Sequence, residues 1–264
     1  MDIVQISDTH FGTEVAEVEA ALVACLTDNP PDIVLLTGDV TQRARRSQFA
    51  KAIKFLNKLP AHDFIAIPGN HDIPLYQFWI RLLQPYRHFQ RAFHEVEVTR
   101  ITDACTIIAI NSTAPSRHKD GLLSRDKIAR VADELANNHH SQLRIVAAHH
   151  PVAVVLPSDK ENIVENAETA VKIWSDAGMD LILGGHIHYP FMAPLSGYYP
   201  NMDTQAWVMQ AGTAVSHRVR NQKPNSFNRI VVSGERAGAR IEQWNYHADG
   251  QRFECAESFT PWKL

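Results

Sequence analysis

Residues 64–72 read FIAIPGNHD, a short apolar run that stops at a glycine and continues directly into three polar side chains. Two similar runs precede it, at residues 3–7 and 33–37, and both end at small or polar residues, as buried parallel strands do. Between the runs, apolar residues recur at helical spacing in residues 15–26 and 49–59. The first 70 residues therefore predict a βαβαβ unit, which indicates an α/β fold with a parallel sheet.

The middle of the chain adds helices and strands of other kinds. Residues 75–93 are rich in aromatic and arginine side chains, and Pro85 is expected to divide them into two short helices. A strand pair is expected at 96–101 and 106–110. Ser124 then predicts the N-cap of a helix that runs to about Asn138.

The last third of the chain predicts a second βαβ pattern and then an antiparallel tail. The pattern has strands at 143–148 and 181–183 and a helix at 167–177, and the tail has strands at 206–209, 227–232, 239–246 and 252–257. Asp249-Gly250 is a hairpin signal between the last two strands. No linker, repeat or low-complexity segment interrupts the sequence. We therefore expect residues 1–264 to form one domain, with a β-hairpin at about 239–257 as an appendage of the sheet.

Polar side chains gather directly after five of the predicted strands. The segments are Asp8-Thr9-His10, Gly38-Asp39, Gly69-Asn70-His71-Asp72, His149-His150-Pro151 and Gly184-Gly185-His186-Ile187-His188. Ligands of open α/β sheets bind outside the carboxyl ends of the strands, so we expect these segments to converge. Carboxylate, carboxamide and imidazole together suit first-row divalent or trivalent metals. The chain has 14 histidines, and the ones in these segments are those placed to bind metal.

Composition excludes several other kinds of protein. The 264 residues are 45% hydrophobic, enough for a sizeable core, and the net charge of −3 offers no basic field for nucleic acid. Three cysteines without CxxC spacing disfavour a disulfide framework and a cysteine–zinc site, and indicate a reducing compartment. The opening residues lack the features of a signal peptide, and no apolar run approaches the length of a membrane span. We therefore expect a cytoplasmic protein.

The five polar segments, in this order, resemble the DxH, GD, GNHD, H and GHxH blocks of the calcineurin-like metallophosphoesterase superfamily. The resemblance covers about residues 8–188, and residues 212–228 resemble the segment located after the GHxH block in bacterial members. Within the superfamily, the chain is most similar to a small bacterial class of cyclic-nucleotide phosphodiesterases and glycerophosphodiesterases. The resemblance implies a four-layer α/β/β/α sandwich of two mixed sheets flanked by helices.

The resemblance also implies a dinuclear metal centre with assigned ligands. Asp8, His10 and His188 would bind one ion, Asn70, His149 and His186 the other, and Asp39 would bridge them. The ions would be iron, manganese or zinc, and a hydroxide between them would be the nucleophile. His71 would be no ligand; it would bind a phosphate oxygen or protonate the leaving alkoxide, and Asp72 would orient it.

Four further side chains are candidate substrate contacts, against the alternative of loop packing or a solvated loop. They are His118, His150, His217 and Arg218. Residues 76–93 could cap the substrate, touch lipid, or only pack on the sheet edge or a second subunit. The C-terminal hairpin would also suit a homodimer contact.

These features predict a dinuclear metal-dependent phosphohydrolase, favouring a small nucleotide-like or glycerol-type phosphodiester as substrate. Pyrophosphohydrolysis of a lipid-linked nucleotide, of the lipid A precursor type, and phosphomonoester hydrolysis are the alternatives. A phosphoprotein phosphatase is less favoured because the GNHD block ends in Asp72 rather than glutamate. A nuclease is less favoured because it would be expected to carry a basic groove, which the composition disfavours. A non-catalytic scaffold would be expected to lose ligands that this chain keeps.

Overall fold

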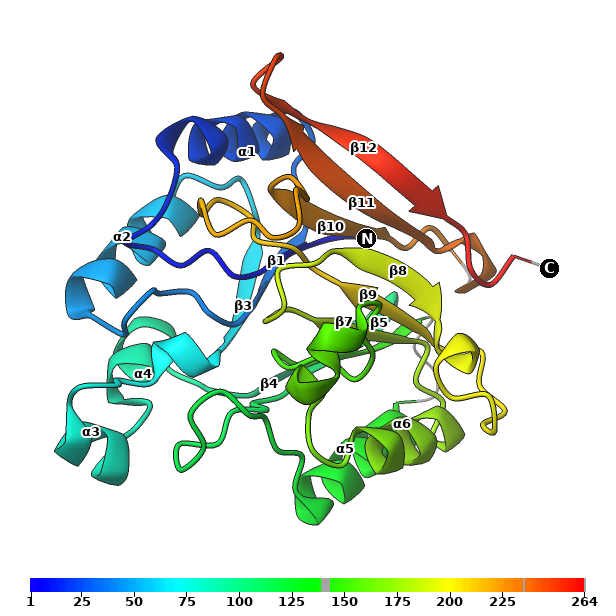
Figure 1. Cartoon of the computed structure of the whole chain (residues 1–264). Coiled ribbons are helices and arrows are strands. Elements are labelled where there is room, and N and C mark those ends of the chain that lie inside the picture. Colours follow the sequence, from blue (N-terminus) through cyan, green and yellow to red (C-terminus); the bar gives the residue numbers. More distant parts are fainter. Residues whose placement is uncertain (139–142, 235, 264) are drawn as a thin grey trace.

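The computed structural model describes residues 1–138, 143–234 and 236–263 and contains two six-stranded mixed sheets packed face to face (Figure 1). Helices lie on the outer side of each sheet, which gives the expected four layers. Alternate residues of each strand point to opposite faces, so each sheet contributes one apolar face to the layer between the sheets. Ile3 and Leu35 from one sheet and Ile145 from the other are buried in that layer.

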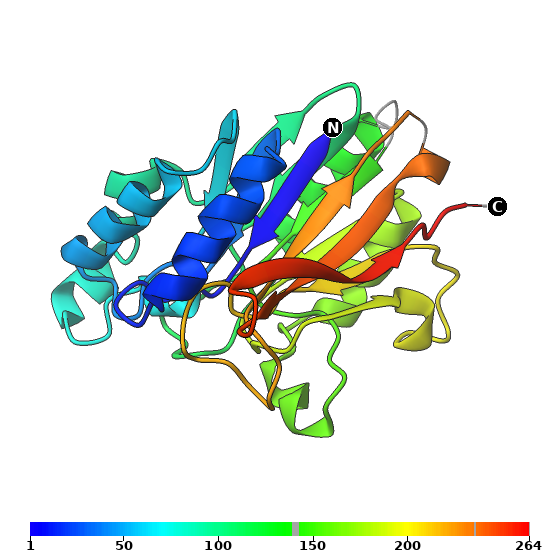
Figure 2. The ribbon, with the colours of Figure 1, turned by 90° about the horizontal axis from the view of Figure 1, so that it is seen from above.

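The first sheet has the strand order β12-β11-β10-β1-β2-β3. Its parallel part is the predicted βαβαβ unit: β1 (Asp2–Ile6), α1 (Ala16–Asp28), β2 (Ile33–Thr37), α2 (Arg46–Leu56) and β3 (Asp63–Ile67). Three antiparallel strands extend it, β10 (Ser226–Val231), β11 (Arg240–His247) and β12 (Arg252–Phe259). Both helices cover the outer face, and Figure 2 shows α1 beside β12, which it contacts.

The second sheet has the strand order β4-β5-β6-β7-β9-β8. Its elements are β4 (Val98–Ile101), β5 (Cys105–Ala109), α5 (Arg125–Asn137), β6 (Leu143–Ala147), α6 (Ala167–Asp176), β7 (Leu181–Gly184), β8 (Phe191–Pro194) and β9 (Trp207–Gln210). The N-cap prediction is confirmed, because the Ser124 hydroxyl accepts a hydrogen bond from the Lys127 amide at 3.3 Å. Short 3-10 helices also occur at η1 (Asn70–Asp72), η2 (Pro157–Asn162), η3 (Leu195–Gly197) and η4 (Arg236–Gly238).

One part of the expected tail is wrong. The sequence places the strand at 206–209 among the antiparallel strands, but β9 pairs in parallel with β7 and antiparallel only with β8. β8 itself has no counterpart in the sequence prediction, because its four residues FMAP end in proline and show no clear alternation. A strand that ends in proline is tolerated at a sheet edge, where no ladder hydrogen bond is lost, and β8 is such an edge.

The aromatic and arginine-rich segment forms two short helices separated by Pro85, as predicted. α4 (Arg87–Phe93) packs on α2, with Phe89 buried against Phe49 at a ring separation of 6.1 Å. α3 (Phe78–Leu83) buries none of its residues, and Trp79 is 70% exposed. Within the described ranges, no helix combines the length and apolarity needed to cross a bilayer.

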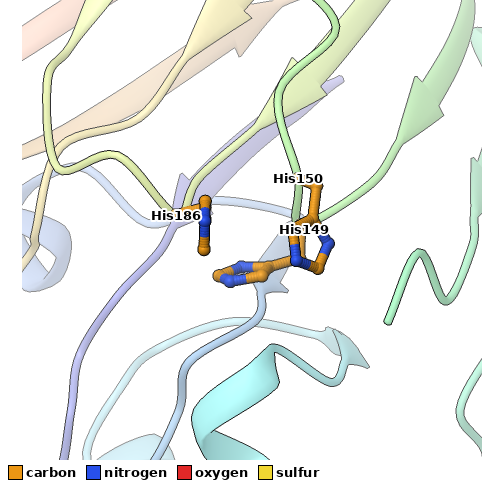
Figure 3. Close-up of side chains that lie close together, drawn as sticks. All are labelled: His149, His150 and His186. Carbon is orange, nitrogen blue, oxygen red and sulfur yellow. The ribbon is translucent and has the colours of Figure 1, made fainter. Parts of the chain in front are cut away.

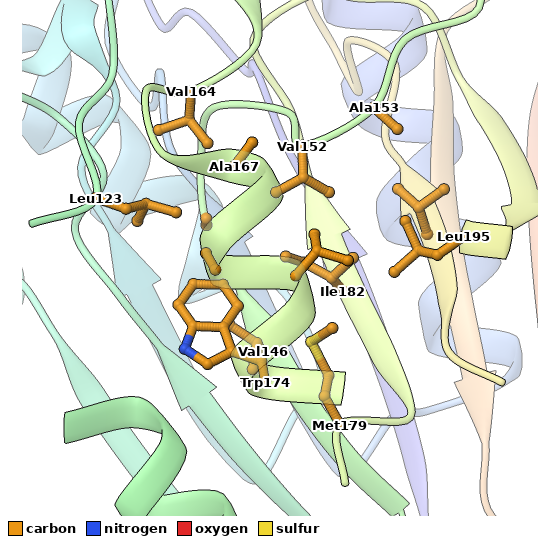
Figure 4. Close-up of a cluster of buried hydrophobic side chains, with 14 of the residues drawn as sticks. Leu123, Val146, Val152, Ala153, Val164, Ala167, Trp174, Met179, Ile182 and Leu195 are labelled. Atoms are coloured by element: carbon orange, nitrogen blue, oxygen red, sulfur yellow. The ribbon is translucent and has the colours of Figure 1, made fainter. Parts of the chain in front are cut away.

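The packing of helices α5 and α6 on the second sheet can be tested by a substitution in the apolar cluster between them. Trp174 of α6 is fully buried among the side chains drawn in Figure 4, and its indole N–H donates to the Ile128 carbonyl at 3.0 Å. Trp174→Ala is expected to lower the free energy of unfolding by about 3–5 kcal/mol, because it leaves a large cavity in the core. Denaturant titration followed by circular dichroism measures this. Thr169→Ala, on the exposed side of α6, is the control and should change stability by less than about 0.5 kcal/mol. An equally small loss for Trp174→Ala would contradict this packing.

Candidate metal centre

The five polar segments predicted from the sequence come together beyond the carboxyl ends of β1, β2, β3, β6 and β7. Glycines allow the close approach. A Cβ atom on Gly38, which has φ +89°, would lie 2.4 Å from His149 Nδ1, and one on Gly69 would lie 2.2 Å from Asp39 Oδ1. A side chain at either position would therefore push predicted ligands apart.

The first cluster consists of Asp8, His10, Asp39 and His188, all buried. The Nε2 atoms of His10 and His188 lie 3.0 Å apart, and His188 Nε2 lies 3.2 Å from Asp8 Oδ1. Asp39 Oδ2 lies 3.7 Å from His10 Nε2. Nitrogen and carboxylate donor atoms thus face one another at short range, an arrangement that a bound cation would stabilise.

The second cluster consists of Asn70, His149 and His186, and it lies on the other side of Asp39 from the first. Asn70 Oδ1 is 3.1 Å from His186 Nδ1 and 3.3 Å from His149 Nε2. His149 and His150 extend from the loop after β6, and His186 approaches from the loop after β7 (Figure 3). Asp39 Oδ1 lies 3.4 Å from His149 Nε2, so the two oxygens of this carboxylate face different clusters. This is the arrangement that a carboxylate bridging two ions requires.

Burial and neighbouring charges set the protonation of these donors. Burial lowers the pKa of His10 and of His186 to about 3. Burial alone would raise the pKa of Asp8 and Asp39, but nearby imidazoles lower both, that of Asp8 to about 2. His188 is the exception, because Asp8 raises its pKa despite burial. Ionised carboxylates and neutral imidazoles are the forms that bind metal.

Hydrogen bonds to the protein orient the ligating atoms. His149 Nδ1–H donates to the Thr37 carbonyl at 2.8 Å, and His188 Nδ1–H donates to the Arg218 carbonyl at 2.6 Å, so each Nε2 faces its cluster. The Ser7 hydroxyl donates to Asp8 Oδ2 at 2.7 Å. Such outer contacts fix the tautomer and the ring orientation of metal ligands. The donor set and its supports therefore fit two bound cations.

The backbone at most of the predicted ligands is left-handed. The φ angles are 50° at Asp8, 43° at His10, 48° at Asp39, 73° at His186 and 54° at His188. Residues other than glycine rarely adopt this backbone conformation, and each one that does costs on the order of 1–3 kcal/mol of folding free energy. Backbone bonds hold the turns, among them Asp8 N–H to the Gly38 carbonyl at 3.1 Å and His10 N–H to the Asp39 carbonyl at 2.9 Å. Strain of this kind concentrates at functional sites.

His71 stands beside the two clusters without joining either. Its Nδ1–H donates to the Gln42 carbonyl at 2.9 Å, and its ring meets that of His10 edge-on with centroids 4.8 Å apart. Its Nε2 lies 3.5 Å from Arg218 Nη1. His71 therefore presents Nε2 next to a fixed cation, at the wall of the cavity above the clusters.

Asp72 has a different place from the one expected. The sequence prediction has Asp72 orient His71, but the Gln42 carbonyl does that. The buried Asp72 carboxylate instead accepts from the amides of Val40, Thr41 and Gly69 and from the Thr41 hydroxyl, at 2.8–3.0 Å. It ties the loop after β2 to the loop after β3 and so positions Asp39 and His71 relative to each other. The difference arises because the loop after β2, which supplies three of these four hydrogen bonds, packs against Asp72 although it is more than 30 residues away along the chain.

The structure places two of the four candidate substrate contacts at a cavity and the other two elsewhere. Arg218 lines a cavity of about 280 Å³ above the clusters. His118 lines a second, adjoining cavity beside His71. His150 is buried, with Nδ1 bonded to the Ser112 hydroxyl and Nε2–H donating to the Lys119 carbonyl, both at 2.9 Å, so neither ring nitrogen is free. His217 is exposed and does not line the cavity above the clusters.

Several side chains of the site were not predicted. Lys119 lines the cavity above the clusters, and Gln42 holds Arg218 Nη1 through its side-chain oxygen at 2.9 Å. Gln42 follows Asp39 by three residues, so proximity to a ligand in the sequence was its one signal. Lys119 lies in a loop whose path the sequence does not reveal.

Comparison with known proteins agrees with the geometry. The family model for calcineurin-like phosphoesterases matches residues 1–190, and the chain therefore belongs to that family. It is an enzyme of the metallophosphoesterase class.

Two curated bacterial relatives are similar in sequence over most of their length. A probable cyclic nucleotide phosphodiesterase of Synechococcus is 26% identical over 208 residues, 73% of this chain and 75% of the relative. A probable glycerophosphodiester phosphodiesterase of Arcobacter nitrofigilis is 26% identical over 202 residues, 71% of this chain and 72% of the relative.

Solved structures share the fold. A dimetal phosphatase from Danio rerio has a TM-score of 0.67 at 11% identity, covering 92% of this chain and 95% of its own. A purple acid phosphatase from yellow lupin seeds has a TM-score of 0.72 at 12% identity, covering 98% of this chain and 53% of its own. At these identities the likeness establishes the architecture of two mixed sheets with flanking helices.

Proposed function

We propose that the chain is a dinuclear metal-dependent phosphodiesterase that hydrolyses a small nucleotide-like or glycerol-type diester. The observation that carries the proposal is the Asp39 carboxylate, which turns one oxygen to His10 and the other to His149. The relatives named as cyclic nucleotide and glycerophosphodiester phosphodiesterases support a diester rather than a monoester.

Seven side chains would hold the ions: Asp8, His10 and His188 on one side, Asn70, His149 and His186 on the other, and Asp39 between them. Bound ions would be iron, manganese or zinc, and would supply Lewis-acid stabilisation of phosphoryl oxygens and a lowered pKa for water. The remaining tasks fall to side chains of the cavity.

His71 and Arg218 are suited to the leaving group and the phosphoryl charge. Because His71 Nδ1–H is engaged by the Gln42 carbonyl, Nε2 is the ring atom left for the substrate, and the imidazolium form of the ring would give its Nε2 proton to the leaving alkoxide and return to the neutral form. Arg218 is fixed by Gln42 through one Nη1 bond and keeps other N–H donors for phosphoryl oxygens. Lys119 and Arg220 also line this cavity, where each is paired with a carboxylate, Glu161 and Asp159 respectively.

Hydrolysis assays test the proposal directly. With added manganese, the protein is expected to hydrolyse bis-p-nitrophenyl phosphate or cyclic AMP faster than p-nitrophenyl phosphate, and dialysis against a chelator should abolish turnover. Restoring manganese to the dialysed protein should restore it. Robust cleavage of the monoester with no turnover of either diester would overturn the diesterase assignment.

A further inference from the structure

A second, smaller cavity of about 90 Å³ adjoins the one above the metal clusters. Asn70 and His71 line both cavities, so a group in the smaller one would lie next to a phosphoester at the centre. The smaller cavity is also lined by Arg43, Arg81 and His118 and by the apolar side chains of Ile73 and Leu75. A water molecule needs about 10–15 Å³ of such space, so the cavity has room for a compact group such as a carboxylate or a phosphate.

The arginines in the lining of this cavity, Arg43 and Arg81, have no acidic partner in it. No carboxylate lines it, and in the described part of the chain neither Arg43 nor Arg81 forms an ion pair. At the neighbouring cavity, by contrast, Arg220 is paired with the buried Asp159 at 2.5 Å. The net charge of −3 means that this concentration of unpaired cations does not follow from a basic composition.

Each guanidinium makes contacts that leave most of its N–H donors free. Arg81 Nη2 donates to the Arg117 carbonyl at 3.1 Å. The Arg43 guanidinium stands over the ring of Tyr76, 5.7 Å from its centroid. A guanidinium has five N–H donors in a planar fork that matches carboxylate and phosphate groups. Two such forks beside one small space form a site prepared for an anion.

We propose that Arg43 and Arg81 determine substrate specificity by binding a second negative charge, carried by a substituent of the diester. The substrate class is then phosphodiesters or pyrophosphodiesters whose substituent bears a carboxylate or a further phosphate close to the scissile phosphorus. A cyclic nucleotide, with one charge, leaves this subsite unused and is a weaker substrate. This inference rests on the proposed function.

A matched pair of substrates isolates the added charge. Ethyl p-nitrophenyl phosphate and 2-carboxyethyl p-nitrophenyl phosphate differ by one carboxylate, and hydrolysis of either transfers the phosphoryl group to water and releases p-nitrophenolate. The wild type is expected to have a KM about tenfold lower for the carboxylated ester. Arg81→Gln and Arg43→Gln should each remove most of this ratio, whereas Arg125→Gln, on the exposed start of α5, should retain it. Equal KM values in the wild type, or a ratio that survives both substitutions, would overturn the subsite.

A binding measurement separates the subsite from the reaction. Hydrolysis-resistant phosphonate analogues of the two esters are titrated calorimetrically into wild type and Arg81→Gln. Tighter binding of the carboxylated analogue by the wild type alone is expected. If neither ester is hydrolysed but p-nitrophenyl phosphate is, the diesterase function fails, and the calorimetric ratio still decides whether the anion subsite exists.

Discussion

Replacing Asp39 with asparagine is expected to lower metal content from about two ions to less than one ion per chain and to abolish turnover of bis-p-nitrophenyl phosphate. The two Asp39 oxygens face different clusters, so one substitution weakens both. The amide retains the volume of the carboxyl but removes the negative charge that offsets two cations. Residues that only support a ligand cost about 10–100-fold in metal affinity when changed, and a shared ligand should cost more.

Metal analysis by mass spectrometry after dialysis, run beside the activity assay, measures the Asp39→Asn effect. Asp133→Asn, on the exposed side of α5, removes the same charge far from the centre and should keep both ions and full activity. Two ions per chain in Asp39→Asn would show that this carboxylate is not shared between the sites.

His71→Ala is expected to lower kcat by about 10²–10⁴-fold while metal content stays at the wild-type level, because general acid catalysis contributes in that range. The ring contacts neither cluster as a ligand, and its hydrogen bond to the Gln42 carbonyl orients Nε2 toward Arg218. The effect should be larger for an alkyl leaving group, which needs a proton, than for p-nitrophenolate, which leaves without one.

The control for this experiment is His62→Ala, an exposed histidine at the opposite end of β3, which should leave kcat unchanged. Unchanged kcat in His71→Ala on a diester with an alkyl leaving group would rule out the proton-transfer role. Loss of metal together with activity would instead assign His71 to the metal centre itself.

The parts of this molecule that sequence predicts well are governed by local patterns. The apolar run at residues 33–37 predicts a strand, and β2 runs over Ile33–Thr37, because a buried parallel strand is a continuous apolar run. The five polar segments converge because carboxyl ends of parallel strands share one edge of a sheet. The edge strand β8 was not predicted, because its apolar run is only four residues long and ends in proline.

The roles of individual polar side chains were harder to predict, since they depend on which loops become neighbours. Asp72 bonds to amides more than 30 residues away, and both ring nitrogens of His150 are used by residues 112 and 119. Arg43, from the loop after β2, and Arg81, from α3, line the same cavity. Such contacts leave no periodic trace in the sequence.

The left-handed backbone at five of the predicted ligands bears on how sequences of this kind would change over generations. Glycine would relieve the backbone strain at each of those positions, because it adopts positive φ without steric penalty. Selection for catalysis must hold aspartate and histidine there against that preference. A lineage released from that selection would gain fold stability by exchanging these ligands for glycine or asparagine. Loss of the centre would therefore be favoured by stability itself, and its return would require several strained residues to be regained together.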